Sequence, residues 1–175
     1  MLLKGKKILI TGIANKYSIA TGIAQSMKNQ GAEIAIAYQN ERLLKNIKPI
    51  AESIKAETLL ELDVGCDESI SRAFDVLKKE WGNLDGIVHS IGFAPADQLE
   101  GNFVDVTTRE GFKIAHDISS YSFTALAKAA KPMLNDNSAL LTLTYLGAMQ
   151  TMPNYNVMGL AKASLEANTR FLAAS

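Results

Sequence analysis

Five short apolar runs alternate along the chain with longer segments in which apolar residues recur every three or four positions. The runs occupy residues 6–12, 32–39, 58–64, 84–91 and 138–145. Alternation of this kind is typical of βαβ units, in which helices join buried parallel strands. Because few polar residues interrupt the runs, each strand is predicted to be buried on both faces. The pattern therefore predicts an α/β fold with a doubly wound parallel sheet in three layers, α/β/α.

Two of the helical segments have clearly marked ends. The first carries an apolar stripe from Ile19 to Met27, with Ser18 as its predicted N-cap and Gly31 as its stop. The segment over residues 68–81 has equally regular apolar spacing and is followed by a glycine. Both segments are therefore predicted to form amphipathic helices that pack on the sheet.

The remaining segments are less regular. Pro49 lies inside the second helical segment, so two short helices are predicted there. Residues 93–111 form a polar stretch that is too long for an ordinary connection between a strand and a helix. A long helix is expected over residues 109–133, and another follows the fifth run. The last helical pattern is still running where the chain stops, so we expect a single domain over residues 1–175, truncated within its last helix and lacking its C-terminal part.

Charge and composition narrow the class of partner. The chain has 18 Lys and Arg against 18 Asp and Glu, so no net field attracts nucleic acid or an anionic membrane. No stretch approaches the roughly 18 uncharged apolar residues of a membrane span, and no secretory leader is apparent, which indicates a cytoplasmic protein. Cys66 is the only cysteine, and His89 and His116 are far apart in the sequence. Neither a disulfide framework nor a metal site is therefore expected.

The turn after the first run has features of a phosphate-binding loop without the G-x-G-x-x-G spacing. Gly12 permits a tight turn, and a helix beginning near Ser18 would present free N–H groups and its positive dipole end to a pyrophosphate. The Ser18 hydroxyl adds a donor, while Ala20 and Gly22 are small enough for the helix to lie close to the sheet. An ordinary strand-to-helix turn with a serine cap would use the same residues, and this alternative stays open.

Other strand ends lie at the edge where a nucleotide would bind. Gln39 ends the second run, where NAD enzymes usually carry an acidic residue and NADP enzymes a basic one. Asp63 and Val64 end the third run, where a carboxylate can accept from an adenine amino group and a valine can cover the ring; a solvent-facing aspartate is the alternative. Ile91 ends the fourth run, beside the expected cofactor channel. NADH is favoured over NADPH, with Arg42 as the reservation.

Tyr155 and Lys162 are seven residues apart on a segment with helical spacing. Seven residues are nearly two turns, so both side chains would leave one helix face roughly 10 Å apart and flank one ligand. Tyr145 ends the fifth run, at the C-terminal edge of the predicted sheet. The alternative interpretation is a partly buried tyrosine, a surface lysine and a packed aromatic residue at a strand end.

Several motifs in chain order carry a resemblance to one family. They are GIANKYSIA at 12–20, HSIGFAP at 89–95, TREGFKIAHDISSYSF at 108–123, and TYLGA followed by PNYNVMGLAKASLEAN at 144–168. With the residues at the second and third strand ends, they resemble bacterial NADH-dependent enoyl-acyl-carrier-protein reductases over the whole chain. That family lies in the short-chain dehydrogenase/reductase superfamily, whose fold is Rossmann-like. Its own marks are a Gly-x5-Ser turn and a Tyr-x6-Lys pair, with Met158 standing where the superfamily has its usual tyrosine.

The resemblance implies reduction of the 2,3 double bond of trans-2-enoyl-acyl-carrier-protein by hydride transfer from NADH, in bacterial fatty acid elongation. It implies cofactor contacts at Gly12, Ser18, Ile19, Gln39, Asp63, Val64, Ile91 and Lys162. Tyr145 and Tyr155 become the active-site pair, and Ala94 lies on the substrate side. Tyr155 would donate its phenol O–H to the thioester oxygen without ionising. Lys162 would hold the nicotinamide ribose, and its charge would favour any phenolate character nearby. A homotetramer is expected, as in the family.

Two alternative functions stay open. A ketone reductase or alcohol dehydrogenase of the same superfamily would need a tyrosine at position 158. A nucleotide-binding or assembly module without catalysis would need none of the three candidate catalytic residues. Because the family continues into further strands and a helical lid over the substrate, the 175-residue polypeptide alone is expected to be inactive.

Overall fold

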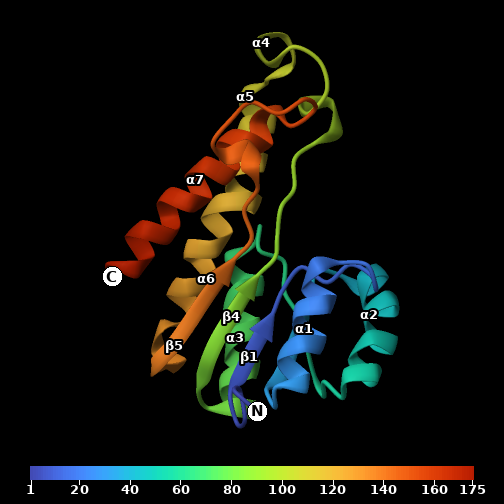
Figure 1. Ribbon diagram of the computed structural model, residues 1–175, viewed down its shortest axis with the longest axis vertical. Coiled ribbons are helices and arrows are strands. Elements are labelled where there is room, and N and C mark those ends of the chain that lie inside the picture. The colour runs from blue at the N-terminus through green and yellow to red at the C-terminus, as the bar shows by residue number, and fades with distance from the viewer. The chain divides into compact units, whose positions relative to one another are not determined.

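A five-stranded sheet with strand order β3-β2-β1-β4-β5 organises the fold (Figure 1). The computed structural model describes residues 1–175. β1 pairs in parallel with both β2 and β4, and β2 pairs in parallel with β3. The predicted parallel α/β sheet is confirmed. Its strands are β1 (Lys7–Ile10), β2 (Glu33–Tyr38), β3 (Thr58–Glu61), β4 (Leu84–His89) and β5 (Leu134–Thr142).

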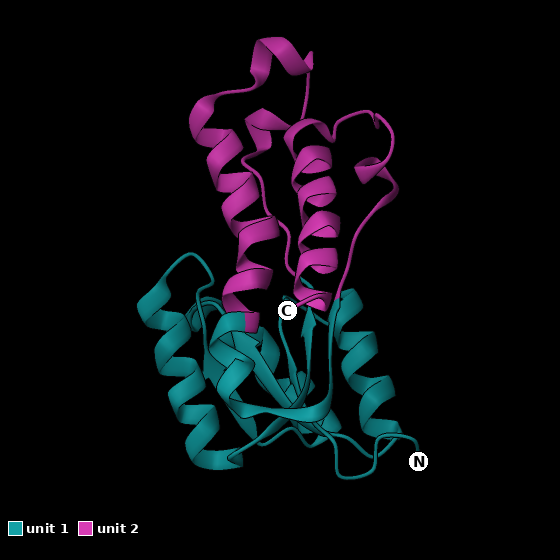
Figure 2. Cartoon of the chain, turned by 90° about the vertical axis from the view of Figure 1, so that its left-hand side faces the viewer, with its two compact units in different colours: residues 1–90, 128–141 teal, residues 91–127, 142–175 magenta.

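The helices follow the strands in the alternation that the sequence predicts. They are α1 (Ile19–Asn29), α2 (Glu41–Ile54), α3 (Asp67–Trp81), α4 (Phe103–Val106), α5 (Arg109–His116), α6 (Ser122–Ala130) and α7 (Asn156–Ala173). None of them is long and apolar enough to cross a membrane. The chain forms two compact units, which Figure 2 distinguishes by colour. Unit 1 comprises residues 1–90 and 128–141, and unit 2 comprises residues 91–127 and 142–175.

Strand alternation in unit 1 directs apolar side chains to both faces of the sheet. Ile8 and Ile10 of β1 lie in one core cluster with residues of α1 and α2, which pack side by side (Figure 1). Leu9, between them in the sequence, is 0% exposed and points to the opposite face. The buried stripe of α3 contains Phe74 and Leu77. α3 connects β3, at one edge of the sheet, to β4 on the other side of β1. Because crossover connections between parallel strands are right-handed, this change of direction places α3 on the face opposite to α1 and α2.

The outer strands differ from the sequence prediction. β3 and β5 are only partly buried, whereas every run was expected to be buried on both faces. The physical reason is that each has one neighbouring strand in the sheet rather than two. β5 also ends at Thr142, so Tyr145 lies beyond the strand rather than at its last position.

α2 also corrects a prediction. Residues Glu41–Ile54 form one helix with Pro49 inside it, not two short helices. Pro49 lies on the exposed side of the helix. The carbonyl that loses its helical partner at a proline can therefore bond to water, which lowers the cost of the interruption. Five buried residues of α2 compensate further by packing on the core.

α1 and α3 confirm their predicted helices. Gly31 follows α1 with φ +94°, and Gly82 follows α3 with φ +74°. These values lie in the left-handed region, which glycine adopts without steric cost. Within α1, however, Ile19 is 69% exposed, so the apolar stripe begins one residue later, at the fully buried Ala20.

The long helix predicted over residues 109–133 has an interruption in unit 2. α5 continues into a π-helical turn at Asp117–Tyr121, which is followed by α6. The polar stretch before it is partly ordered by Gln98, which is 2% exposed. The Gln98 side-chain oxygen accepts two hydrogen bonds from Thr108, one from its backbone N–H at 2.9 Å and one from the Thr108 hydroxyl at 3.1 Å. Gln98 thus fixes the start of α5.

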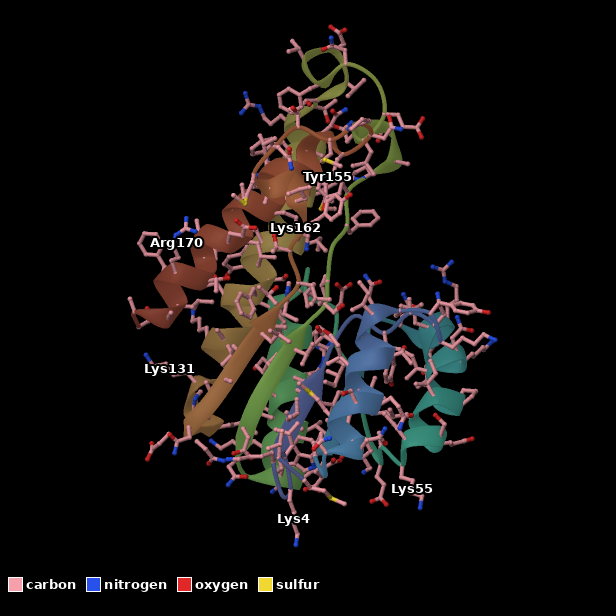
Figure 3. All side chains as sticks on the ribbon, viewed as in Figure 1. Lys4, Lys55, Lys131, Tyr155, Lys162 and Arg170 are labelled. Carbon is pink, nitrogen blue, oxygen red and sulfur yellow. The ribbon has the colours of Figure 1, made fainter.

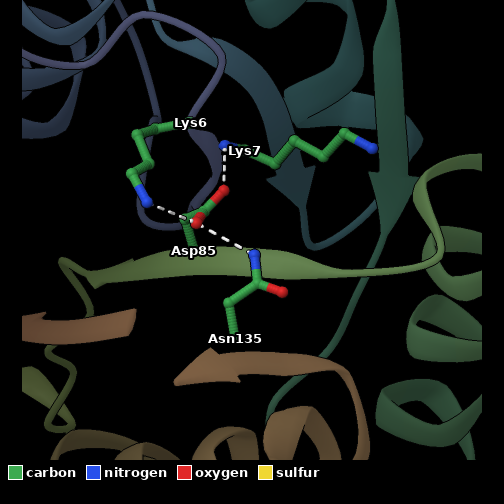
Figure 4. Close-up of polar contacts among 4 residues, drawn as sticks. All are labelled: Lys6, Lys7, Asp85 and Asn135. Carbon is green, nitrogen blue, oxygen red and sulfur yellow. Dashed lines mark hydrogen bonds and ion pairs between the residues drawn. The ribbon is translucent and has the colours of Figure 1, made fainter. Parts of the chain in front are cut away.

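One carboxylate joins the beginnings of three strands in unit 1 (Figure 4). Asp85 of β4 accepts hydrogen bonds from the Lys7 backbone N–H, the Lys6 ammonium and the Asn135 amide, each at 2.9 Å. Burial would raise the pKa of Asp85, but these hydrogen bonds outweigh it and hold the pKa below its ordinary value of 3.8. Asp85 therefore stabilises the fold in its ionised form.

Asp85→Asn is expected to lower the free energy of unfolding by about 1–3 kcal/mol at neutral pH, because the amide replaces an acceptor of three bonds. A carboxylate whose pKa is lowered in the folded state stabilises the fold fully at pH values above its unfolded pKa. This stabilisation is lost as the pH falls through the folded pKa. The difference from the wild type should therefore persist at neutral pH and shrink below pH 3.8. Urea unfolding at several pH values measures it, with the exposed Asp75→Asn on α3 as the control. A pH-independent difference would contradict the role of the charge.

Candidate functional site

The first strand-to-helix turn of unit 1 is built on close backbone packing at Gly12. Gly12 has φ +83°, a conformation that side chains rarely adopt. A Cβ placed there would overlap the carbonyl of Ser90, which follows β4. Thr11 reinforces the contact, because its hydroxyl donates to the Val88 carbonyl at 3.0 Å. Glycine is thus required at position 12 for the ends of β1 and β4 to approach each other.

Ser18 lies at the N-cap position of α1, but its side chain makes no capping bond. Its oxygen instead accepts from the backbone N–H groups of Ala14 at 3.0 Å and Asn15 at 3.1 Å. Ser18 is therefore the N-cap residue, as predicted, but its side chain turns back and closes the preceding loop in place of a capping bond. This arrangement leaves the hydroxyl proton available to a ligand, together with the unbonded N–H groups of the first helical turn.

The first residues of α1 differ in how far their side chains are exposed to solvent. The exposed side chain of Ile19 extends from the start of α1. Ala20 is fully buried, as expected for close packing. Gly22 has open space around it, so its predicted packing role is wrong. The side of α1 that carries Gly22 faces away from the core.

The other predicted contacts of unit 1 lie after β2 and β3. Gln39 is exposed and directly follows Tyr38, the last residue of β2. Asp63 is half-buried, and one of its carboxylate oxygens accepts from the Gly65 backbone N–H at 3.0 Å. Val64 is only 8% exposed and offers little surface. A contact with adenine would therefore depend more on the second oxygen of Asp63 than on the valine.

In unit 2, Tyr145 and Tyr155 form an edge-to-face pair with ring centroids 5.0 Å apart. Tyr155 precedes α7 rather than lying on it, since the helix begins at Asn156 and the Tyr155 backbone is not helical. The predicted common helix face is therefore wrong. Figure 3 shows Tyr155 beside the start of the helix and Lys162 further along it. The tight turn that carries Tyr155 has positive φ at both Asn154 and Asn156.

Two glycines leave the space in which the Tyr155 ring lies. A Cβ at Gly147 would overlap the Tyr155 ring. A Cβ at Gly159 would lie 2.7 Å from the Gly147 carbonyl oxygen. α7 and the loop after β5 are thereby in direct backbone contact under the ring. No local sequence pattern marks this role of Gly147 and Gly159, so it was not predicted.

An apolar cluster supports the other side of Tyr155. It contains Ala94, Ala115, Val157, Met158 and Ala161, with Leu99 and Tyr155 packed against it. Met158 therefore occupies an apolar environment in which a tyrosine hydroxyl would need a polar partner. The cluster also brings the predicted substrate-side residue Ala94 near the tyrosine, although Ala94 itself is only 8% exposed.

Electrostatics keep Tyr155 neutral. Burial, and secondly the neighbouring Tyr145, raise the pKa of the Tyr155 phenol above its ordinary value of 10.0. Desolvation disfavours the phenolate form of Tyr155. Tyr155 is a phenol at neutral pH and can donate a hydrogen bond from its O–H.

Lys162 is only 8% exposed, and two backbone carbonyls hold its ammonium. The Lys162 Nζ donates to the Leu143 carbonyl at 2.9 Å and to the Ile91 carbonyl at 3.3 Å. Burial lowers the pKa of Lys162 below its usual 10.5. An ammonium has three donors, so one remains after these two bonds. The predicted cofactor residues Ile91 and Lys162 are thus in contact.

A groove of about 400 Å³ lies next to Tyr155 in unit 2. Met149 and Met152 line this groove. Phe123, in contrast, is 1% exposed and lies within the core. Tyr121 lines a separate groove along α5. Unit 2 therefore combines an apolar surface, a neutral phenol and a fixed cation.

A model of the family described as Enoyl-(Acyl carrier protein) reductase matches residues 12–175. The chain is 60% identical over 171 residues to the enoyl-acyl-carrier-protein reductase (NADH) of Escherichia coli strain K12 and 52% identical over 173 residues to that of Neisseria meningitidis. These alignments cover 98% of this chain but only 65% and 66% of the relatives, so the chain spans about two thirds of their length.

Solved structures give the same likeness. The enoyl-acyl-carrier-protein reductase (NADH) of Aquifex aeolicus has a TM-score of 0.97 and 46% identity, over 99% of this chain and 69% of that one. The enoyl-acyl-carrier-protein reductase of Anaplasma phagocytophilum, crystallised in complex with NAD, has a TM-score of 0.96 and 43% identity, over 99% of this chain and 66% of that one.

Proposed function

The chain belongs to the enoyl-acyl-carrier-protein reductase family of the short-chain dehydrogenase/reductase superfamily, and we propose that the intact protein reduces trans-2-enoyl-acyl-carrier-protein with NADH during bacterial fatty acid elongation. The observation that carries the proposal is the neutral Tyr155 phenol, paired edge to face with Tyr145 in the unit that also fixes the Lys162 ammonium. We further propose that both units belong to one dinucleotide-binding reductase domain.

The residues of unit 1 fit the adenosine and pyrophosphate parts of NADH. Ser18 keeps a hydroxyl proton beside the N-terminus of α1, where backbone N–H groups favour an anion. Gly12 shapes the turn, and exposed Ile19 and Gln39 offer contact surface. Neither Gln39 nor its successor Asn40 is basic, which favours NADH over NADPH. The NAD complex of the Anaplasma phagocytophilum relative supports the same cofactor.

Lys162 and Ile91 would hold the nicotinamide half. Two carbonyls fix the ammonium of Lys162, and its third donor is available to a ribose hydroxyl. Because the side chain is nearly buried, this donor has little freedom to choose another partner. The role of Lys162 is thus to bind and orient, and its partial burial strengthens each hydrogen bond that it makes.

NADH, when bound, supplies a hydride to C3 of the enoyl thioester. The electron pair of the double bond then shifts to give an enolate whose charge lies on the thioester oxygen. That oxygen needs a hydrogen-bond donor until a proton adds at C2 and completes the reduction. The Tyr155 phenol meets that need without ionising, and the raised pKa keeps the proton on its oxygen. Tyr145, which is 48% exposed and packs against the Tyr155 ring, would fix its orientation and border the acyl chain.

The partners and location belong to the same proposal. The acyl chain of a carrier-protein-bound thioester would pass near Ala94, on the apolar cluster that supports Tyr155. We also propose a homotetramer in the cytoplasm. Exposed Phe112 and Tyr121 on the long helix of unit 2 are apolar surface that a neighbouring subunit could cover. Sedimentation of the intact protein measures the number of subunits.

The test is a comparison of two thioester substrates with the intact protein. Crotonyl thioester should be reduced with NADH and much more slowly with NADPH, whereas acetoacetyl thioester should not be reduced. The reason for the second result is that Met158 replaces the tyrosine that ketone reduction requires in the superfamily. Loss of NADH absorbance measures both reactions. Ketone reduction without enoyl reduction would contradict the proposed function.

A further inference from the structure

The π-helical turn between α5 and α6 changes how the long helix faces its neighbours. Asp117–Tyr121 form the turn, and Ser119 and Ser120 inside it are 0% and 2% exposed. A π turn inserts an extra residue into an α-helix and is frequent at functional sites. Here it directs two small polar side chains into the interior of unit 2, where each must find a partner.

Ser119 holds both backbone groups of one residue in the segment after β4. Its oxygen accepts from the Phe93 backbone N–H at 2.9 Å, and its hydroxyl donates to the Phe93 carbonyl at 2.9 Å. The Phe93 side chain is 53% exposed, so packing of the ring contributes little to holding the backbone there. Ser119 therefore restrains the Phe93 backbone directly.

The same segment holds the Lys162 ammonium. The Ile91 carbonyl, two residues before Phe93, accepts from the Lys162 Nζ at 3.3 Å. A Cβ on Gly92 would lie 3.4 Å from that Nζ, so the backbone passes directly beside the ammonium. A shift of the segment would therefore move an acceptor of Lys162 and alter the direction of its remaining donor.

We propose that Ser119 is a positioning residue for Lys162, and that it acts by fixing the backbone of Ile91–Phe93. The inference rests on the proposed function where it concerns NADH. Its structural part concerns only the hydrogen bonds of unit 2. Both hydrogen bonds of the Ser119 side chain go to Phe93, not to Lys162 or Tyr155. The effect on Lys162 is therefore transmitted by the backbone of Ile91–Phe93.

Ser120 is a matched control within the same turn. It is equally buried, and its hydroxyl is bonded to the Ser164 hydroxyl at 2.8 Å and to the Asn168 amide at 2.9 Å. These partners lie on α7, away from residues 91–93 in the hydrogen-bond network. Ser120→Ala thus removes a comparable buried hydroxyl without touching the proposed connection to Lys162.

The first experiment needs no ligand. Amide hydrogen exchange is compared in the intact wild type, Ser119→Ala and Ser120→Ala. Exchange at Phe93 should become about tenfold faster in Ser119→Ala, because the amide loses its acceptor, and should stay near the wild-type rate in Ser120→Ala. Equal exchange at Phe93 in all three proteins would overturn the restraint. If Ser119→Ala folds poorly, Ser119→Cys takes its place, because cysteine has a similar volume and makes weaker hydrogen bonds. Exchange at Phe93 in Ser119→Cys should then be faster than in the wild type.

The second experiment is a double-mutant cycle on NADH dissociation constants, measured by calorimetry. Ser119→Ala should weaken NADH binding about tenfold in the wild-type background and less than about twofold in the Lys162→Ala background. Ser120→Ala should change the dissociation constant less than about twofold in the wild-type background. Equal effects of Ser119→Ala in the two backgrounds would show that the serine does not act through Lys162.

The two experiments separate the inference from the proposed function. If the wild type fails to bind NADH, the proposed function is wrong, while exchange at Phe93 still decides whether Ser119 restrains the segment. If the wild type binds NADH and reduces crotonyl thioester but the cycle is additive, the function stands and the positioning role is refuted. A general loss of thermal stability in both serine variants, with unchanged NADH binding, would also refute it.

Discussion

Tyr155→Phe is expected to lower the turnover of crotonyl thioester about 100- to 1,000-fold, the usual cost of removing one preorganised donor to a developing oxyanion. NADH binding should change less than about twofold, because the substitution removes only a hydroxyl and keeps the ring. The ring itself remains seated against Tyr145, 5.0 Å away, and over Gly147. Steady-state kinetics at saturating NADH and calorimetric titration measure the two quantities separately.

Lys162→Ala provides the contrast to this result. It should weaken NADH binding, since it removes the donor proposed for the ribose and leaves the Leu143 and Ile91 carbonyls without their ammonium partner. Tyr121→Phe, which removes a hydroxyl from a tyrosine on the long helix, is the control and should leave both quantities unchanged. Loss of NADH binding in Tyr155→Phe with intact turnover in Lys162→Ala would mean that the two roles are wrongly assigned.

Gly12→Ala is expected to have the largest effect on the fold, with a loss of at least about 2–3 kcal/mol in the free energy of unfolding. Two costs combine at this position. The backbone has φ +83°, and the new methyl group would overlap the Ser90 carbonyl, which is main chain and cannot rotate away. NADH binding should fall as well, because β1 and β4 would separate at the turn proposed to hold the pyrophosphate.

Gly22→Ala is the matched control for Gly12. Gly22 lies in the same segment, within α1, with open space around it and no positive φ. The same substitution should therefore stabilise the protein by about 0.5–1 kcal/mol, because alanine favours the helix over glycine. Urea unfolding of the two variants measures both signs. A Gly12→Ala protein as stable as the wild type would contradict the close approach of the two strand ends.

The sequence was most informative where structure depends on local interactions. Apolar spacing predicted α1 and α3, and glycines marked the ends of both helices, because periodicity and turn conformations depend on neighbouring residues. Pro49 gave a wrong prediction for the same reason. A local rule predicts that proline breaks any helix. The actual destabilisation of α2 depends on whether Pro49 lies on the exposed side of the helix, and only the packed structure determines that.

The candidate site shows the same division. Motif spacing identified Tyr145, Tyr155 and Lys162, but it placed Tyr155 on a helix that begins one residue later. It also assigned a capping bond to Ser18, whose oxygen is used by the preceding loop. Both errors concern side-chain direction at an element boundary, where a change in one backbone dihedral redirects the side chain and spacing has no further information.

The sequence by itself determined the parallel α/β architecture, the family and the residue types of the candidate site, because these follow from periodicity and from motifs in chain order. Only the tertiary structure decided that Ser119 holds Phe93, that carbonyls of Ile91 and Leu143 fix the Lys162 ammonium, and that Gly147 seats the Tyr155 ring. These contacts join segments that are distant in the sequence. Their geometry depends on how whole helices and loops pack, which no local pattern encodes.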